Sequence, residues 1–99
     1  MKMVLLVCNS YFMDRVMQIL KDNGIDYFTS WDRAKGKGHG TEPHLGSGGF
    51  GSTNSVTMVA FEDDAPLEGL IRSIKQANQE TKRAADHIRL FQLPLERIV

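Results

Sequence analysis

The glycine-rich stretch from Gly36 to Thr53, GKGHGTEPHLGSGGFGST, is the part of the sequence that comes nearest to a phosphate-binding motif. It holds seven of the nine glycines in a chain of 99 residues. Its second half nearly matches the pattern G-x-x-x-x-G-K-[ST], in which backbone amides and a lysine bind nucleotide phosphates. However, Ser52 stands in the place of that lysine. The following residues, NSVTMVAFE, are also typical of a strand, whereas a phosphate loop must open a helix. The sequence therefore argues against a loop of this type.

Basic side chains within this stretch and near the C-terminus are candidates for a different kind of anion site. They are Lys37, His39, Lys82, Arg83, His87 and Arg89. Lysine and arginine donate charge-assisted hydrogen bonds to phosphate or carboxylate groups. For Lys82 and Arg83 a solvated helix end is an equal alternative, because cations interact favourably with the dipole there.

His39, Glu42 and His44 could form a metal site, since histidine and carboxylate ligands suit zinc or copper. Ligands on a glycine-rich loop are poorly preorganised, so solvated side chains are the favoured interpretation and the metal site is the alternative. No Ser-His-Asp, paired-carboxylate or Cys-His arrangement occurs at a usable spacing. We therefore expect no enzymatic activity.

Composition limits the class of protein. Twelve acidic residues balance twelve Lys and Arg, so extensive electrostatic binding to nucleic acid is not expected. The single Cys8 lies in an apolar run and excludes an intramolecular disulfide. No signal-like segment or apolar run of about twenty residues is present. We expect a cytoplasmic protein with one domain over residues 1–99.

Hydrophobic patterning predicts six elements. A continuous apolar run over 2–8 indicates a buried strand. Asn9 and Ser10 can cap a helix that ends near Gly24. Further strands are expected over 25–35, 54–62 and 87–93. Between the last two, apolar residues at helical spacing indicate an amphipathic helix, followed by the polar stretch NQETKRAAD. The apolar positions are Leu67, Leu70, Ile71, Ile74 and Ala77. Trp31 is expected in the core, or else beside a cleft.

This order of elements, βαββαβ, predicts a ferredoxin-like α+β fold. Its four-stranded antiparallel sheet would carry two helices on one face. Because the first strand is apolar from Met3 to Cys8, both faces of the sheet require burial. We therefore expect a homo-oligomer packed through the open face. A connection as long as Gly36–Thr53 between paired strands is usually functional or disordered.

With this pattern in place, the chain resembles the PII signalling family. Lys35, Gly36 and Gly38 match that family's K-G-x-G-R pattern at the base of its long "T-loop", with His39 in place of the arginine. Thr41, Glu42, Gly46 and Ser47 match the T-E-x-x-x-G-S spacing, and the closing LFQLPLERIV is similar to the family's last strand. The resemblance implies a homotrimer that binds adenine nucleotides in clefts between subunits and docks a partner through the loop.

The resemblance, together with the basic residues above, gives two candidate sets. The ligand-binding set is Lys35, Gly36, Lys37, Gly38, His39, Thr81, Lys82, Arg83, His87 and Arg89. The docking set on the flexible loop 36–53 is Thr41, Glu42, His44, Ser47 and Phe50.

The departures from the family concern nucleotide binding. The family's glycine-rich B-loop corresponds here to TKRAADHIRLF, which has no glycine, although Thr81 remains and Arg89 replaces a lysine. The family's C-terminal R-x-R has no counterpart before Val99, and Gly40 replaces a glutamine that helps to bind 2-oxoglutarate and magnesium. The loop tyrosine that some members carry for uridylylation is absent too.

The sequence thus indicates a divergent PII-like signalling protein. It would bind a small anionic metabolite, such as ATP, ADP or another adenine nucleotide, and regulate a transporter or metabolic enzyme. Two alternatives share the topology. One is a metal-handling trimer similar to the divalent-cation tolerance proteins, with His39, Glu42 and His44 as ligands. The other is a metabolite-binding domain of the ACT type, which would not explain so long a loop.

Overall fold

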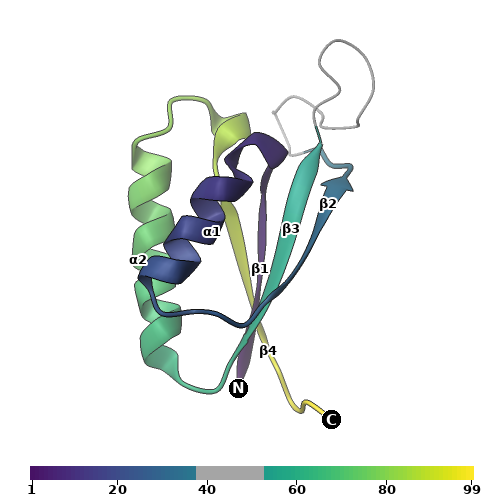
Figure 1. The fold of residues 1–99 in the computed structure, drawn as a ribbon, viewed down its shortest axis with the longest axis vertical. Helices are drawn as coiled ribbons and strands as arrows, with labels where there is room; N and C mark the ends of the chain where they lie inside the picture. The colour runs from purple at the N-terminus through teal and green to yellow at the C-terminus, as the bar shows by residue number, and fades with distance from the viewer. Residues whose placement is uncertain (38–52) are drawn as a thin grey trace.

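A computed structural model of the chain describes residues 1–37 and 53–99 and shows a four-stranded sheet with two α-helices on one face (Figure 1). In chain order the elements are β1 (Lys2–Asn9), the 3-10 turn η1 (Ser10–Phe12), α1 (Met13–Asp22), β2 (Thr29–Ala34), β3 (Asn54–Phe61), α2 (Asp64–Gln79), the 3-10 turn η2 (Ala84–Asp86) and β4 (Arg89–Pro94). The strands follow the spatial order β2-β3-β1-β4, and every neighbouring pair is antiparallel. The predicted ferredoxin-like fold is confirmed.

The core lies between the sheet and the helices. Alternate residues of β1, namely Val4, Leu6 and Cys8, are buried on the helix-covered face. The helices meet them with one apolar stripe each, as the spacing predicts. The buried helical side chains are Val16 and Leu20 of α1 and Leu67, Leu70, Ile74 and Ala77 of α2.

Both predicted limits of the first helical segment are recognisable. The side chain of Asn9 accepts a hydrogen bond of 3.1 Å from the backbone N–H of Tyr11, so Asn9 caps the 3-10 turn that precedes α1. At the other end Gly24 has φ +71°, the left-handed conformation that glycine adopts readily after a helix.

Some predicted boundaries were wrong. The second strand begins at Thr29 instead of residue 25, and Ile25 is instead buried, its N–H bonded to the carbonyl of Leu20. Helix α2 continues to Gln79 and takes up the start of the polar stretch, because its apolar stripe ends only at Ala77. The last strand begins at Arg89 instead of residue 87.

The second face of the sheet carries no helix and is apolar. The register places Met3, Leu5 and Val7 of β1 on this face, opposite Ala60, Met58 and Val56 of β3. Its outer strands add large exposed side chains: Trp31 is 47% exposed, Phe91 53% and Leu93 39%. The expected core position of Trp31 was wrong, because its pairing with Val56 directs it to this face.

No helix among residues 1–37 and 53–99 is both long enough and apolar enough to cross a membrane.

Candidate functional site

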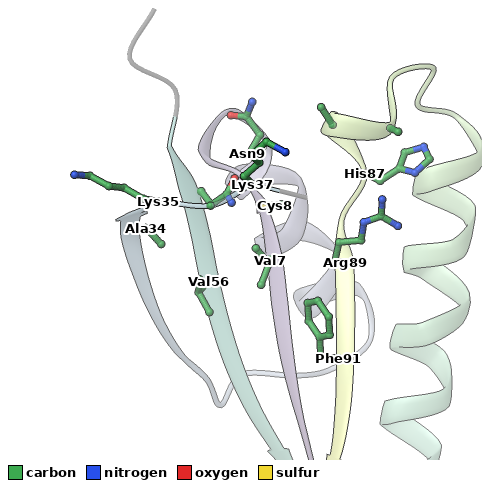
Figure 2. A pocket seen from close by; sticks show the side chains of 14 residues that line it. Val7, Cys8, Asn9, Ala34, Lys35, Lys37, Val56, His87, Arg89 and Phe91 are labelled. Atoms are coloured by element: carbon green, nitrogen blue, oxygen red, sulfur yellow. The ribbon is translucent and has the colours of Figure 1, made fainter. Parts of the chain in front are cut away.

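A hollow of about 380 Å³ lies at the end of the sheet where β1 and β2 finish and β3 begins (Figure 2). Its apolar part consists of Val7, Val56 and Phe91, which share the open face of the sheet. Its polar part comes from two segments that are distant in the sequence. One is the stem 34–37, which begins at the last residue of β2, and the other runs from η2 into β4. The hollow thus combines an apolar floor with a rim that carries Lys35, Lys37, His87 and Arg89.

Gly36 brings the two stems of the long connection close together. A Cβ atom at Gly36 would lie 2.6 Å from Nδ2 of Asn54, at the start of β3, which is closer than real Cβ contacts come. A larger residue at this position would therefore require the Asn54 side chain to shift, whereas the φ of Gly36 is not in the left-handed region.

Asn78 fixes the second segment of the rim. Its Nδ2 donates to the carbonyl of Ile88 and its Oδ1 accepts from the N–H of Ile88, both at 2.8 Å. The carboxamide thus pairs with the backbone just before β4, as a neighbouring strand would. Ile88 is only 4% exposed and lies between His87 and Arg89. Asn78 therefore fixes the backbone positions from which the side chains of His87 and Arg89 project.

His87 has a further anchor at the end of α2. Its Nε2 lies 3.1 Å from the carbonyl oxygen of Thr81, and the hydroxyl of Thr81 donates to the carbonyl of Ala77. The hydroxyl of Thr81 thus closes the last turn of α2, and its backbone carbonyl orients the imidazole ring of His87.

The rim has an excess of positive charge. Lys35, Lys37 and Arg89 form no ion pair with any residue in the described ranges. Of the nearby carboxylates, Asp86 lies 4.0 Å from Arg83, and Asp32 accepts a hydrogen bond from Ser55. Figure 2 shows Arg89 and His87 on the β4 side of the hollow, with Lys35 extending away from them. An anion entering the hollow would meet cationic donors without displacing an acidic partner of Lys35, Lys37 or Arg89 from the described part of the chain.

Cys8 also contributes to the wall of the hollow, but not as a reactive thiol. It is 3% exposed, as its place in the apolar run predicts. Burial, together with the charge of Asp32, raises the pKa of the Cys8 thiol from 9.0 to about 11. A protonated thiol is a poor nucleophile and a poor metal ligand.

The structure brings together half of the predicted ligand-binding set. Lys35, Gly36, Lys37, His87 and Arg89 all border the hollow. Thr81, Lys82 and Arg83 do not border it; Lys82 and Arg83 are exposed between α2 and η2, which fits the solvated helix end. Gly38 and His39 lie outside the described residues, as does the whole docking set of Thr41, Glu42, His44, Ser47 and Phe50.

The alternative metal ligands His39, Glu42 and His44 also lie outside the described residues. Within residues 1–37 and 53–99, no group of three or more His, Cys, Asp or Glu side chains is arranged to hold a metal ion.

Sequence reasoning missed Asn78 and the apolar floor. The continuous apolar run of β1 signals an apolar open face, but which residues form the floor of the hollow follows from the strand register. The pairing of Asn78 with Ile88 had no signal in the sequence, because an asparagine in the last turn of a helix is not unusual.

A second hollow, of about 680 Å³, lies at the opposite end of the open face. Tyr27, Phe28 and Met58 contribute to its apolar lining, and its charged residues are Glu62 and Asp63. Its carboxylates would repel an anion, so the hollow at the base of the long connection is the better candidate for an anionic ligand.

Comparison with known proteins supports the fold. No family model matches the sequence, and no curated protein matches it. Among solved structures, the chain is similar to CPII, a nitrogen regulatory PII-like protein from Thiomonas intermedia K12. CPII bound to ADP, AMP and acetate superposes with a TM-score of 0.69 at 13% identity, over 97% of this chain and 88% of CPII. CPII bound to ADP, AMP and bicarbonate gives 0.70 at 11% identity, over the same shares. The resemblance to PII-like proteins is thus confirmed at the level of the fold.

Proposed function

We propose that this chain is a PII-like regulatory protein of one domain, over residues 1–99, which binds a small anionic metabolite in the hollow at the base of the long connection. The observation that carries the proposal is the cationic rim above an apolar floor. Lys35, Lys37 and Arg89 have no acidic partner in the described ranges, and the floor is formed by Val7, Val56 and Phe91. An adenine nucleotide suits both parts, with its base against apolar side chains and its phosphates beside the cations. The solved CPII structures, which hold ADP, AMP and small anions, support this choice.

We further propose that the protein is a homotrimer packed through the open face of its sheet. The support is the apolar character of that face, including the exposed Trp31 and Phe91. Large exposed apolar patches usually mark an interface. Packing subunits through this face would also cover part of the hollow, since Val7 and Val56 belong to both. The ligand would then lie in a cleft between subunits.

The proposed output is regulation of a protein partner rather than catalysis. Ligand bound beside Gly36 and Lys37 would bias the segment 36–53 toward one arrangement, which a transporter or metabolic enzyme would recognise. A ligand can shift such an equilibrium only by binding one arrangement more tightly than the other. Contacts at the start of the segment would supply this difference.

Isothermal titration with ATP, ADP and AMP tests the binding site. Side-chain cations replace the glycine amides of a B-loop, so we expect micromolar or weaker binding that added salt reduces further. A charged hydrogen bond contributes about 1.5–3 kcal/mol, and about 1.4 kcal/mol corresponds to tenfold in affinity. Arg89→Ala should therefore weaken binding by about tenfold or more. Lys75→Ala, which removes an exposed cation from α2 away from the hollow, is the matched control.

Light scattering tests the assembly. A trimer has about three times the chain mass of 11.1 kDa, and Arg89→Ala should leave that mass unchanged. A stable monomer would contradict the cleft between subunits. Nanomolar binding that Arg89→Ala does not change would show that the site lies elsewhere, and a failure of all three nucleotides to bind would exclude them as ligands.

A further inference from the structure

Strand β2 contains one residue more than its pairing with β3 can accommodate. Trp31 pairs with Val56 and Ala34 with Asn54, so Asp32 and Arg33 together stand opposite Ser55. Two residues facing one define a β-bulge. Arg33 has φ +62°, and it is the one described residue other than glycine with positive φ. This conformation is unfavourable for a residue with a Cβ atom, so interactions elsewhere must maintain it.

The side chain of Asp32 is bonded across the bulge. The Ser55 hydroxyl, on a residue that is 1% exposed, donates to Oδ1 of Asp32 at 2.6 Å. The hydroxyl of Ser10 lies 3.2 Å from that of Ser55 and 3.1 Å from that of Thr53, and the Ser10 N–H donates to the carbonyl of Thr53. Asp32 is thereby tied to a buried polar group that also holds the start of β3 against η1.

The bulge decides which side chains of the stem face the hollow. Side chains of paired residues lie on the same face of a sheet, and the faces alternate along a strand. If the ladder continued without a bulge after Trp31, then Arg33 and Lys35 would share the open face with Trp31, because a shift of one residue exchanges the faces. With the bulge, Ala34 takes the place opposite Asn54, and Gly36 follows it.

The observed positions of the side chains agree with this account. Ala34 and Gly36 border the hollow beside Val56 with no more than a methyl group and a hydrogen atom, while Lys35 and Lys37 contribute to its rim. Figure 2 shows the Lys35 side chain extending away from Arg89 and Phe91. Two long cationic side chains in place of Ala34 and Gly36 would occupy much of the space, and at Gly36 one would also require the Asn54 side chain to shift.

We propose that Asp32 is a positioning residue, whose bond to Ser55 maintains the bulge that leaves the hollow open for its ligand. The ligand in this inference rests on the proposed function, whereas the geometry of β2 does not depend on it. Asp32 would affect ligand binding only indirectly, by fixing the backbone path of β2. It would also keep Lys35 at the edge of the site, where the side chain can reach a ligand without blocking its entry.

The test compares two uncharged variants, Asp32→Asn and Asp32→Ala. Asparagine keeps an oxygen that accepts from Ser55, whereas alanine does not, so their comparison isolates the bond from the loss of negative charge. One neutral hydrogen bond contributes about 1 kcal/mol, or about fivefold in a binding constant. In calorimetry with ADP, well below the unfolding temperature, Asp32→Ala should bind about fivefold or more weakly than Asp32→Asn. A residue that only stabilises the fold would give equal affinities under these conditions.

Backbone NOEs without ligand provide the second measurement. In the wild type and in Asp32→Asn, they should pair Ala34 with Asn54, and Arg33 should show the coupling constant of a positive φ. In Asp32→Ala, Arg33 should pair with Asn54 instead.

The two measurements separate the two ideas. If Asp32→Ala keeps the Ala34–Asn54 pairing, or if it changes the pairing but binds ADP as Asp32→Asn does, the positioning role is overturned. If the wild type fails to bind ADP while the pairing depends on Asp32 as stated, the role of Asp32 in maintaining the bulge stands and the proposed nucleotide site is wrong.

Discussion

Replacing Asn78 by alanine tests how the start of β4 is held. The variant removes both 2.8 Å bonds to the backbone of Ile88. It also leaves the N–H and carbonyl of that residue without these partners next to a side chain that is 4% exposed. A neutral hydrogen bond contributes about 1 kcal/mol, and a buried group left unsatisfied costs about 1–3 kcal/mol. We therefore expect Asn78→Ala to lower the free energy of unfolding by about 2–4 kcal/mol. For a domain of this size, about 1 kcal/mol shifts the melting temperature by about 4–8 °C.

Urea unfolding followed by circular dichroism measures this change, and an unaltered m value would show that the unfolded states are comparable. Gln79→Ala is the control, since Gln79 is exposed in the same turn of α2; its replacement gains less helix propensity than that of Asn78, so propensity alone would leave Asn78→Ala the more stable of the two variants. The ADP affinity of the folded Asn78→Ala variant should also fall, because His87 and Arg89 flank Ile88. If Asn78→Ala and Gln79→Ala unfold at the same urea concentration, Asn78 does not stabilise the start of β4.

Three further predictions concern single sites. Gly36→Ala should weaken ADP binding and alter the NMR signals of the Asn54 side chain, because the new Cβ would lie 2.6 Å from Nδ2 of Asn54; an unchanged spectrum would refute the close approach. The pKa of Cys8 is raised from 9.0 to about 11 by burial and then by Asp32, so the thiol favours folding below pH 9, and this contribution is lost as the pH rises through 11. The stability advantage of the wild type over Cys8→Ala should therefore shrink by about 2 kcal/mol between pH 9 and pH 11, and a constant difference in denaturant unfolding would contradict it. The pKa of the Glu80 carboxyl is lowered, first by the hydrogen bond from Arg15 and then by the one from Gln76. An NMR titration should therefore show this pKa rising in Arg15→Ala. The free energy of unfolding at neutral pH should change little, because the pair is exposed.

Much of the fold could be predicted because the signals are local. The continuous apolar run of β1, the stripe of α2 and the stop at Gly24 each depend on residues close together in the sequence. The bulge in β2 could not be predicted in this way. Nothing in the segment TSWDRA indicates that Asp32 and Arg33 share one partner, since this depends on Ser55 and on a register that the sequence of β2 alone does not contain.

The site was half predicted for a similar reason. The family resemblance placed Lys35, Gly36 and Arg89 near one another, and the structure brings them to one hollow. Which side of the sheet each residue faces depends on pairing, so the floor of Val7, Val56 and Phe91 follows only from the register. Trp31 shows the same limit, because its position on the open face follows from its pairing with Val56.

The segment between α2 and β4 explains how an anion could be bound without a glycine-rich loop. A B-loop presents backbone amides, which needs glycines that allow close approach of a phosphate. Here Ala84–Asp86 forms a 3-10 turn in which the N–H of Asp86 already bonds the carbonyl of Arg83, and that of His87 bonds Ala84. The amides of Asp86 and His87 thus have partners within the turn, and the positive charge that the segment offers a ligand comes from the side chains of His87 and Arg89. Side-chain cations exposed to solvent are screened by salt far more than buried amides. The salt dependence of ADP binding should therefore be steep in the wild type and shallower in Arg89→Ala, which would distinguish this mode of recognition from one based on backbone amides.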